Sequence, residues 1–192
     1  MYYSKRAMRL VAEDALAEFP TTPVSIESPC GPCPGCLQSS IVADATNLCA
    51  VSIVRSGDAL LESVRELVPG CKVGKILIQR DESHPNKLPK LFYSKLPTDI
   101  QHNNMFVLLC DPMLATGGSA VTALDVLVKG HGVDPTKIIF ANMICAPEGL
   151  QVLAEAYPNV KIVTAVIDQH LNEDKFIVPG LGDYGDRFFN TE

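Results

Sequence analysis

The sequence predicts an α/β fold in which a central, mostly parallel sheet is flanked by helices. Residues 106–110 are all apolar, without polar alternation, which is typical of a parallel strand covered on both faces. Apolar residues at helical spacing follow in residues 120–128, as expected for a strand–turn–helix unit. The length of 192 residues suits one domain with a substantial core, so we expect residues 1–192 to form a single domain.

Composition and charge exclude several classes of protein. With 47% hydrophobic and 20% charged residues, the chain is an ordinary globular protein. The 16 Lys and Arg against 22 Asp and Glu give a net charge of −6, which opposes attraction to nucleic acid or to an anionic membrane. No apolar stretch reaches the roughly 20 residues of a membrane span, and no signal-peptide apolar region follows the start. We therefore expect a cytoplasmic protein without nucleic-acid or membrane partners.

The predicted elements follow one another from the first residues onward. Residues 4–18 are predicted to form an amphipathic helix, because apolar residues recur at three- and four-residue intervals and the pattern stops before Pro20. Residues 19–50 are rich in Pro, Ser, Thr, Gly and Cys, and long loops of this kind are often functional. Strands and helices then alternate: strand 51–54, helix 59–67, strand 74–82, turn 83–89, strand 90–97, strand 106–110, helix 120–128, strand 137–145, turn 146–149, helix 150–156 and strand 160–167. Residues 168–192 are glycine-rich and non-periodic, and composition alone indicates a loop.

The seven cysteines form two groups. Four of them lie in or beside apolar runs and are expected to be free, buried thiols: Cys49, Cys71, Cys110 and Cys145. Cys30, Cys33 and Cys36 have Cys-x-x-Cys-x-x-Cys spacing and could hold a soft metal if a fourth ligand came from His84 or from a second subunit. A turn-rich insertion with exposed thiols explains the same residues, because a second Cys-x-x-Cys pair is missing.

The strand at 106–110 leads into the segment that predicts the chemistry. Asp111 follows at the carboxyl edge of the sheet, where ligands of α/β proteins bind, and Pro112 cannot continue the strand ladder. Residues 115–119 are small and precede a helix, so their backbone amides can approach a phosphate at the positive end of the helix dipole. Asp111 would repel that phosphate, and its carboxylate suits sugar hydroxyls instead. Together these features predict a ribose-5-phosphate site, although any strand-to-helix turn can carry glycines.

Two arginines stand at the ends of other predicted strands. Arg55 follows strand 51–54 beside a glycine, and Arg80 lies near the end of strand 74–82. A pyrophosphate requires both backbone amides and guanidinium groups, which suits these positions. Without further context, arginines at such positions are more often surface or salt-bridged residues.

The segment from Asp111 to Ser119 resembles the phosphoribosyl pyrophosphate (PRPP) motif of type I phosphoribosyltransferases, in the form found in uracil phosphoribosyltransferases. The strings Val-Ser-Ile-x-Arg-Ser-Gly at 51–57 and Gly-Lys-Ile-Leu-Ile-Gln-Arg-Asp-Glu at 74–82 resemble the eukaryotic-type members. The resemblance implies the type I phosphoribosyltransferase fold, with a β-arm at about 21–50, a flexible hood at about 80–97 and a uracil-binding loop at about 168–192. It implies catalytic roles for Asp111, Asp183 and Arg80. The residues implied to bind PRPP are Arg55, Arg80, Asp111, Pro112, Met113, Leu114, Ala115, Thr116, Gly117, Gly118, Ser119 and Asp183.

The last stretch resembles the family's uracil-binding loop. Uracil presents an acceptor, a donor and an acceptor along one edge, which backbone groups can match where glycines allow a close approach. The resemblance implies that backbone at Ile177, Gly182 and Tyr184 reads the base, with Asp183 beside the base and ribose. Two residues depart from the family pattern. Phe176 stands where tyrosine is common, and Asn190 stands in place of a glycine.

The resemblance implies a pentosyltransferase of pyrimidine salvage, which joins uracil to PRPP and gives UMP and pyrophosphate. It implies Mg²⁺ carried by PRPP rather than by direct protein ligands, and a homodimer or homotetramer. Arg6 matches an arginine that contributes to GTP binding in regulated members, whose other basic residue would lie upstream of Met1; a solvated helix residue is the alternative. The alternatives for function are an inactive relative acting as a nucleotide-sensing RNA regulator, which the acidic charge opposes, or a transferase for a purine or orotate, which the loop at 177–184 opposes.

Overall fold

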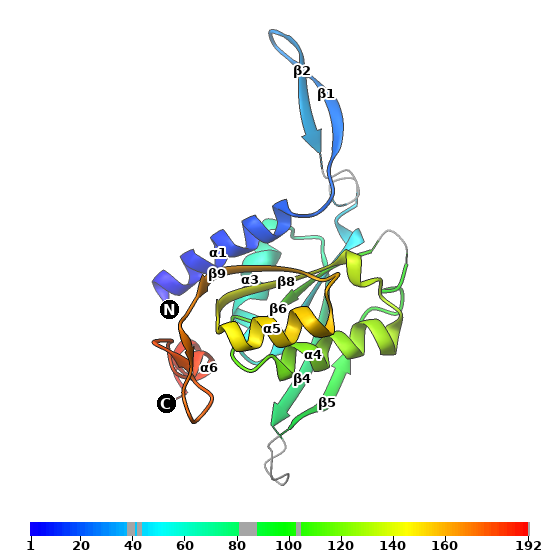
Figure 1. The fold of residues 1–192 in the computed structure, drawn as a ribbon. Helices are drawn as coiled ribbons and strands as arrows, with labels where there is room; N and C mark the ends of the chain where they lie inside the picture. The colour runs from blue at the N-terminus through cyan, green and yellow to red at the C-terminus, as the bar shows by residue number, and fades with distance from the viewer. Residues whose placement is uncertain (38–40, 42–43, 81–87, 103–104, 192) are drawn as a thin grey trace.

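The computed structural model describes residues 1–37, 41, 44–80, 88–102 and 105–191. In this part of the chain, a seven-stranded sheet forms the centre of the molecule (Figure 1). Its strands run in the order β5–β4–β3–β6–β8–β9, and the two-residue β7 continues the line of β6 beside β8. All pairs are parallel except β4 with β5. The strand bounds are β3 (Leu48–Val54), β4 (Lys72–Arg80), β5 (Pro89–Lys95), β6 (Phe106–Cys110), β7 (Met113–Leu114), β8 (Ile138–Cys145) and β9 (Lys161–Ile167).

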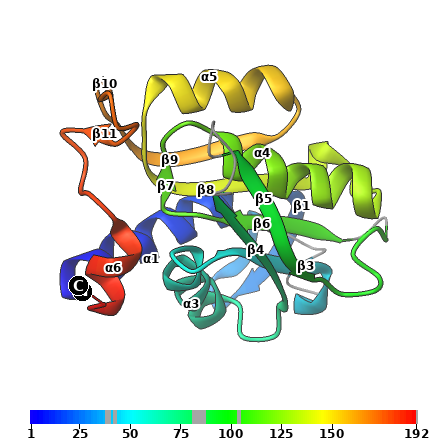
Figure 2. The ribbon, with the colours of Figure 1, turned by 90° about the horizontal axis from the view of Figure 1, so that it is seen from below.

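Helices cover both faces of this sheet, as Figure 2 shows. Helices α1 (Tyr2–Ala17) and α3 (Gly57–Leu67) pack on one face, and α4 (Gly118–Asp125) and α5 (Pro147–Ala156) pack on the other. The short helical segments are η1 (Ala45–Asn47), η2 (Val126–Gly130), which continues α4, and η3 (Pro135–Lys137). None of the helices within the described residues combines the length and the apolar character needed to cross a membrane.

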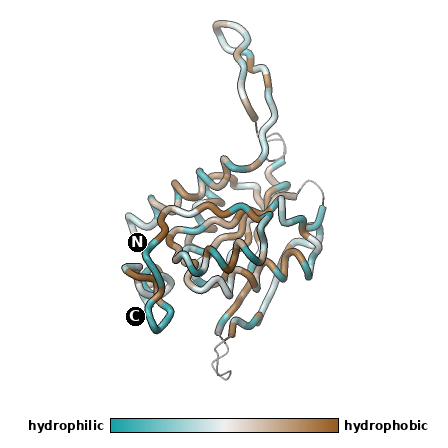
Figure 3. Tube along the Cα trace, in the orientation of Figure 1, coloured by the Kyte–Doolittle hydropathy of each residue, from teal (hydrophilic) through white to brown (hydrophobic). Residues whose placement is uncertain are grey.

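The core consists of two apolar layers, one on each face of the sheet. Alternate residues of β6 divide between them, so that Leu108 packs toward α1 and α3 while Leu109 packs toward α4 and α5. Both faces of this strand are therefore buried, which explains its unbroken apolar sequence. The hydrophobic stretches of the trace accordingly run through the body of the molecule (Figure 3). The thiols of Cys49, Cys110 and Cys145 are buried and free, as predicted, and Cys71 is half-buried.

The connections that follow β3 and β6, two neighbouring strands, lead to opposite sides of the sheet. From β3 the chain crosses through α3 to β4, whereas from β6 it crosses through α4 on the opposite face to β8. The carboxyl ends of β3 and β6 therefore form a topological switch point, which is where open α/β sheets bind ligands.

An antiparallel hairpin of β1 (Thr22–Ser28) and β2 (Gly31–Leu37) projects from the body (Figure 1). This hairpin occupies the segment for which the resemblance implied a β-arm. Cys30 lies in its turn, and Cys33 and Cys36 lie in β2, all three exposed. No cluster of metal-ligating side chains occurs among the described residues, so in these the three thiols do not converge on a metal site. His84 lies outside them.

Three local features differ from the sequence prediction. Pro112 does not end strand pairing, because β7 resumes it one residue later. The predicted turn at 146–149 is instead the start of α5, with Pro147 in the first turn, where its missing N–H costs no hydrogen bond. The C-terminal segment is partly regular, with β10 (His170–Leu171) paired to β11 (Ile177–Val178) and a final helix, α6 (Tyr184–Phe189).

Candidate active site

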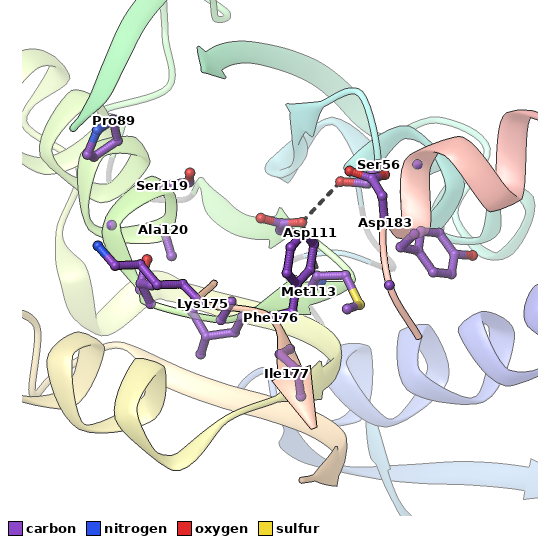
Figure 4. A pocket seen from close by; sticks show the side chains of 18 residues that line it. Ser56, Pro89, Asp111, Met113, Ser119, Ala120, Lys175, Phe176, Ile177 and Asp183 are labelled. Atoms are coloured by element: carbon purple, nitrogen blue, oxygen red, sulfur yellow. Dashed lines mark hydrogen bonds between the residues drawn. The ribbon is translucent and has the colours of Figure 1, made fainter. Parts of the chain in front are cut away.

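A cavity of about 280 Å³ lies at the carboxyl ends of the central strands (Figure 4). It is formed by the turn after β3, the segment from β6 into α4, and the C-terminal segment around β11 and α6. The residues that line it are Ser56, Pro89, Asp111, Met113, Leu114, Ala115, Thr116, Gly117, Gly118, Ser119, Ala120, Lys175, Phe176, Ile177, Gly182, Asp183, Tyr184 and Gly185. The predicted phosphate and base segments therefore meet in one cavity, although they are far apart in the sequence.

Asp111 lies at the bottom of the cavity and is only 7% exposed. Burial raises the pKa of its carboxyl group to about 7, because the charged form loses hydration. Hydrogen bonds from the Met113 amide and the Ser56 hydroxyl oppose that rise, but both are long, at 3.4 Å to Oδ1. The carboxylate therefore keeps capacity to accept hydrogen bonds from a ligand.

The segment 115–119 forms the turn that enters α4. Gly117 precedes the helix with φ of +82°, a conformation that glycine adopts without strain. Its carbonyl accepts the first helical hydrogen bond, from Val121 N at 2.9 Å. The earlier amides of this turn have no partner within the helix and point toward its N-terminal end, where the helix dipole favours an anion. This is the geometry of a phosphate site.

The start of α5 packs directly against this phosphate turn. A side chain added at Gly149 would come within 2.3 Å of the Ala115 carbonyl oxygen, so the contact requires glycine. The neighbouring Glu148 accepts a hydrogen bond from the Leu171 amide at 2.9 Å. The start of α5 therefore supports both the turn at 115–119, called the phosphate turn below, and the β10–β11 hairpin of the C-terminal loop at 168–192, called the base loop below.

Tyr184 connects the base loop to the first helix. Its ring is buried, and its hydroxyl group hydrogen bonds with Ser4 and lies 3.5 Å from Met8 Sδ, both on α1. Because the side chain is used for packing, Tyr184 can present its backbone to the cavity, as do Gly182 and Ile177. This placement is compatible with the prediction that backbone groups of these residues bind uracil, which stays a prediction.

Asp183 caps α6 at the edge of the cavity. Its Oδ1 accepts a hydrogen bond from Asp186 N at 3.0 Å, which satisfies one of the free amides at the start of that helix. Asp183 also lines the cavity (Figure 4). Its position agrees with a role beside base and ribose, and it holds the loop in shape at the same time.

Arg55 follows β3 but turns its guanidinium group toward α6. Nη2 lies 2.5 Å from Asp186 Oδ1, and Nη1 donates to Thr191 Oγ1 at 3.0 Å. The Thr191 hydroxyl group in turn donates to Asp186 Oδ1 at 2.6 Å, and the hydrogen bonds from Thr191 and from Arg55 lower the pKa of Asp186. The structure thus places Arg55 beside the cavity, in a surface ion pair. It was predicted to contact pyrophosphate, which would have to compete with Asp186 for this group.

Other predicted residues lie elsewhere. Arg80 is the last residue of β4, and nothing is described of its side chain; the predicted hood residues 81–87 lie outside the described residues. β5, on the far side of this segment, reaches the cavity through Pro89. Pro112 is buried and is not among the residues that line the cavity, although Asp111 and Met113 on either side of it are. Arg6 is exposed on α1, 5.8 Å from the centre of the Tyr2 ring, and its GTP role stays a prediction.

Five side chains of the cavity were not predicted as site residues, namely those of Ser56, Pro89, Ala120, Lys175 and Phe176. Ser56 contacts Asp111, and its place directly after Arg55 was the available signal. Lys175 adopts a positive φ of 65°, unusual for a residue with a side chain, and presents its ammonium group at the cavity (Figure 4). Phe176 is half-exposed beside Asp111, at the position where the sequence departs from the family's tyrosine.

Sequence comparison extends the likeness to the whole chain. A family model for uracil phosphoribosyltransferase matches residues 1–191. The uracil phosphoribosyltransferase of Dictyostelium discoideum is 46% identical over 192 residues, which cover 100% of this chain and 84% of the relative. That of Saccharomyces cerevisiae is 44% identical over 189 residues, covering 98% and 83% of the two chains.

Solved structures agree with this relationship. A protein of Aquifex aeolicus is similar with a TM-score of 0.76 and 31% identity, over 95% of this chain and 81% of that one. A purine phosphoribosyltransferase of Pyrococcus horikoshii shares the fold, with a TM-score of 0.51 at 11% identity over 90% and 94% of the chains. The type I phosphoribosyltransferase fold predicted from the sequence is confirmed, and the chain belongs to the uracil phosphoribosyltransferase family.

Proposed function

We propose that this protein is a uracil phosphoribosyltransferase, which transfers phosphoribosyl from PRPP to uracil in pyrimidine salvage and releases pyrophosphate. The observation that carries the proposal is the single cavity in which a buried carboxylate, a phosphate turn and a glycine-rich base loop meet. Membership of the family supports the same reaction. The protein's contribution is to position two substrates and to stabilise charge, without a covalent nucleophile.

Asp111 and the turn at 115–119 would hold the sugar phosphate. The backbone amides before α4 suit the 5-phosphate, and the Asp111 carboxylate suits the ribose hydroxyls one group away. With both ends held, the anomeric carbon faces the base loop. A positive charge that develops on the ribose ring would also be favoured by the nearby carboxylates of Asp111 and Asp183.

The base loop would select a small planar imide. Ile177, Gly182 and Tyr184 line the cavity, and their backbone groups would match the acceptor–donor–acceptor edge of uracil. Arg55 would move from Asp186 toward the leaving pyrophosphate, because two phosphate groups attract a guanidinium more strongly than one partly exposed carboxylate.

Mg²⁺ is proposed as the cofactor, carried mainly by the pyrophosphate group of PRPP. The cavity fits a cation that is carried by the substrate, because Asp111 and Asp183 line it and their carboxylates favour positive charge, while substrate phosphates and water can supply the oxygen ligands of Mg²⁺. When bound, the ion would neutralise charge on the leaving pyrophosphate. The protein side chains would orient the sugar and base around it.

We further propose a cytoplasmic homodimer or homotetramer. The β1–β2 hairpin supports an oligomer, because it projects from the body and exposes apolar Ile26 and Leu37. Sedimentation equilibrium of the full chain, compared with the Ile26→Lys variant, tests this proposal. A monomer at micromolar concentration would contradict it.

The function is tested by UMP formation from uracil and PRPP with Mg²⁺, comparing the wild type with Asp111→Ala. We expect turnover that falls by at least about 100-fold in the variant. Hypoxanthine and orotate serve as competing bases, and neither should react at a comparable rate. Absence of UMP formation by a folded wild type that still binds PRPP would contradict the proposal and favour a nucleotide-sensing relative.

A further inference from the structure

The hydrogen-bond ladder between β6 and β8 is irregular at the ribose-binding aspartate. Asp111 N donates to the Ala141 carbonyl at 3.2 Å, as in a parallel ladder. Beyond it, the Met143 and Ile144 amides both donate to the Pro112 carbonyl, at 3.1 and 3.0 Å. Neither of these two β8 amides donates to the carbonyl group of Asp111. A buried carbonyl needs another donor, since leaving it unpaired is costly.

Asn142 supplies that donor from the middle of β8. Its side chain is fully buried, and its Nδ2 donates to the Asp111 carbonyl oxygen at 3.0 Å. On the other side, its Oδ1 accepts a hydrogen bond from Thr164 Oγ1 of β9 at 2.8 Å. The amide orientation follows from the chemistry, because a carbonyl can only accept and Asn142 must turn its NH₂ group toward Asp111.

We propose that Asn142 is a positioning residue for Asp111 in the transferase reaction. The Asp111 carbonyl belongs to the peptide that joins Asp111 to Pro112, so fixing its direction fixes both the Asp111 side chain and the start of the phosphate turn. Thr164 fixes Asn142 in turn, which makes a three-residue chain from β9 through β8 to the end of β6. This inference rests on the proposed function and adds the residues that hold its sugar-binding carboxylate.

The surroundings support a positional role. The sequence around Asn142, residues 138–145, is otherwise apolar, and the strand is buried on both faces along most of its length. A polar amide in such a strand is retained only where its hydrogen bonds are satisfied. Both polar atoms of Asn142 are satisfied, and the group that it holds is the backbone of the one acid buried in the cavity.

Four variants test the inference through steady-state kinetics with each substrate varied in turn. Asn142→Asp keeps the shape but replaces the donor with an acceptor. Thr164→Val removes the hydroxyl group that orients Asn142, and Thr164→Ser keeps it. Ile139→Val is the matched control, because it removes one methyl group from the same buried strand at the position paired with Leu108, three residues before Asn142.

We expect Asn142→Asp to lower kcat/KM for PRPP by about 10- to 100-fold, because small displacements of a substrate-holding group have effects of this size. Thr164→Val should lower it by about 3- to 10-fold, since the amide is loosened but retained. Thr164→Ser and Ile139→Val should stay within about twofold of the wild type, and KM for uracil should change little in all four. This pattern differs from that of a general loss of stability, which would move Ile139→Val as well.

Values for Thr164→Val within twofold of the wild type, in a folded protein, would overturn the inference even if Asn142→Asp did not fold. A loss shared equally by Ile139→Val, or confined to KM for uracil, would overturn it too. A wild type that forms no UMP would refute the proposed function instead, whereas an active wild type with unchanged variants would refute this inference alone.

Discussion

Replacing Asp111 with asparagine should stabilise the free protein at neutral pH while removing its activity. Burial raises the pKa of Asp111 from 3.8 in the unfolded chain to about 7 in the folded one. Between these values the folded protein holds a proton that the unfolded chain has released, so the free energy of unfolding falls as pH rises from about 4 to about 7. About three pKa units at 1.36 kcal/mol each give a loss of about 4 kcal/mol. Asparagine stays neutral and avoids that loss.

The assay is urea unfolding of wild type and Asp111→Asn without substrates, at pH values from 4 to 8. We expect the difference in unfolding free energy to be smallest near pH 4, where the unfolded chain has only begun to release the proton, and to grow in favour of the variant up to about pH 7. Comparing the two proteins at each pH removes the contribution of all other titrating groups. A difference that does not change with pH would refute the assigned pKa shift and its cause.

The same ionisation should appear in the kinetics. The charged carboxylate accepts hydrogen bonds from ribose hydroxyls through both oxygens and more strongly than the neutral carboxyl group, so kcat/KM for PRPP should rise with pH through about 7. In Asp111→Asn, an NH₂ group replaces one acceptor, and the remaining activity should lose this dependence. PRPP also titrates near pH 6, but its ionisation is common to both proteins.

Three further substitutions test separate parts of the site. Lys175→Gly should raise the free energy of unfolding by up to about 1 kcal/mol, because glycine adopts a φ of 65° without strain. The same change removes the Lys175 ammonium group from the cavity and should raise KM for PRPP severalfold. Urea unfolding measures the first effect and steady-state kinetics the second. Asn190 closes α6 with φ of 56°, so Asn190→Gly should be nearly neutral and Asn190→Val should cost about 1–2 kcal/mol, measured by thermal unfolding with Asn190→Asp as control. Gly149→Ala places a methyl group 2.3 Å from the Ala115 carbonyl oxygen and should raise KM for PRPP at least about tenfold, and an unchanged value would contradict the proposed support of the phosphate turn.

The main elements of the fold could be predicted because their signals are local. Strand β6 is buried on both faces and has a continuous apolar sequence, while α1 buries one face and shows three- and four-residue spacing. The carboxyl end of β6 then located Asp111 and the phosphate turn, since parallel strands deliver ligand-binding loops at one edge of the sheet. These residues do line the cavity.

The features that the sequence did not predict depend on distant partners. Helix α6 has only six residues, too few for a periodic pattern, and it forms because Tyr184 and Phe188 pack against the layer built by α1. Arg55 could be placed at a strand end, but its partner Asp186 is 131 residues away in the sequence. The left-handed conformation of Asn190 likewise explains why a glycine is usual there, as only a few residues accept it.

Asn142 shows that a nonlocal network can still leave a trace in the sequence. A single side-chain amide in a buried apolar strand must find hydrogen-bond partners. The position of Asn142 within the apolar run at 138–145 could therefore have predicted that its side chain hydrogen bonds to a neighbouring strand. What it holds is the backbone carbonyl group of Asp111. The side-chain carboxylate of that residue is costly to bury, and its hydrogen bonds from Ser56 and Met113 are long, at 3.4 Å. Ribose hydroxyl groups would supply the missing hydrogen bonds, so binding would relieve a cost that the free protein carries. A ligand without ribose hydroxyl groups would leave the carboxylate without these hydrogen bonds. The buried Asp111 would therefore lower the stability of the free protein and, by the same property, favour ligands that carry the ribose hydroxyls.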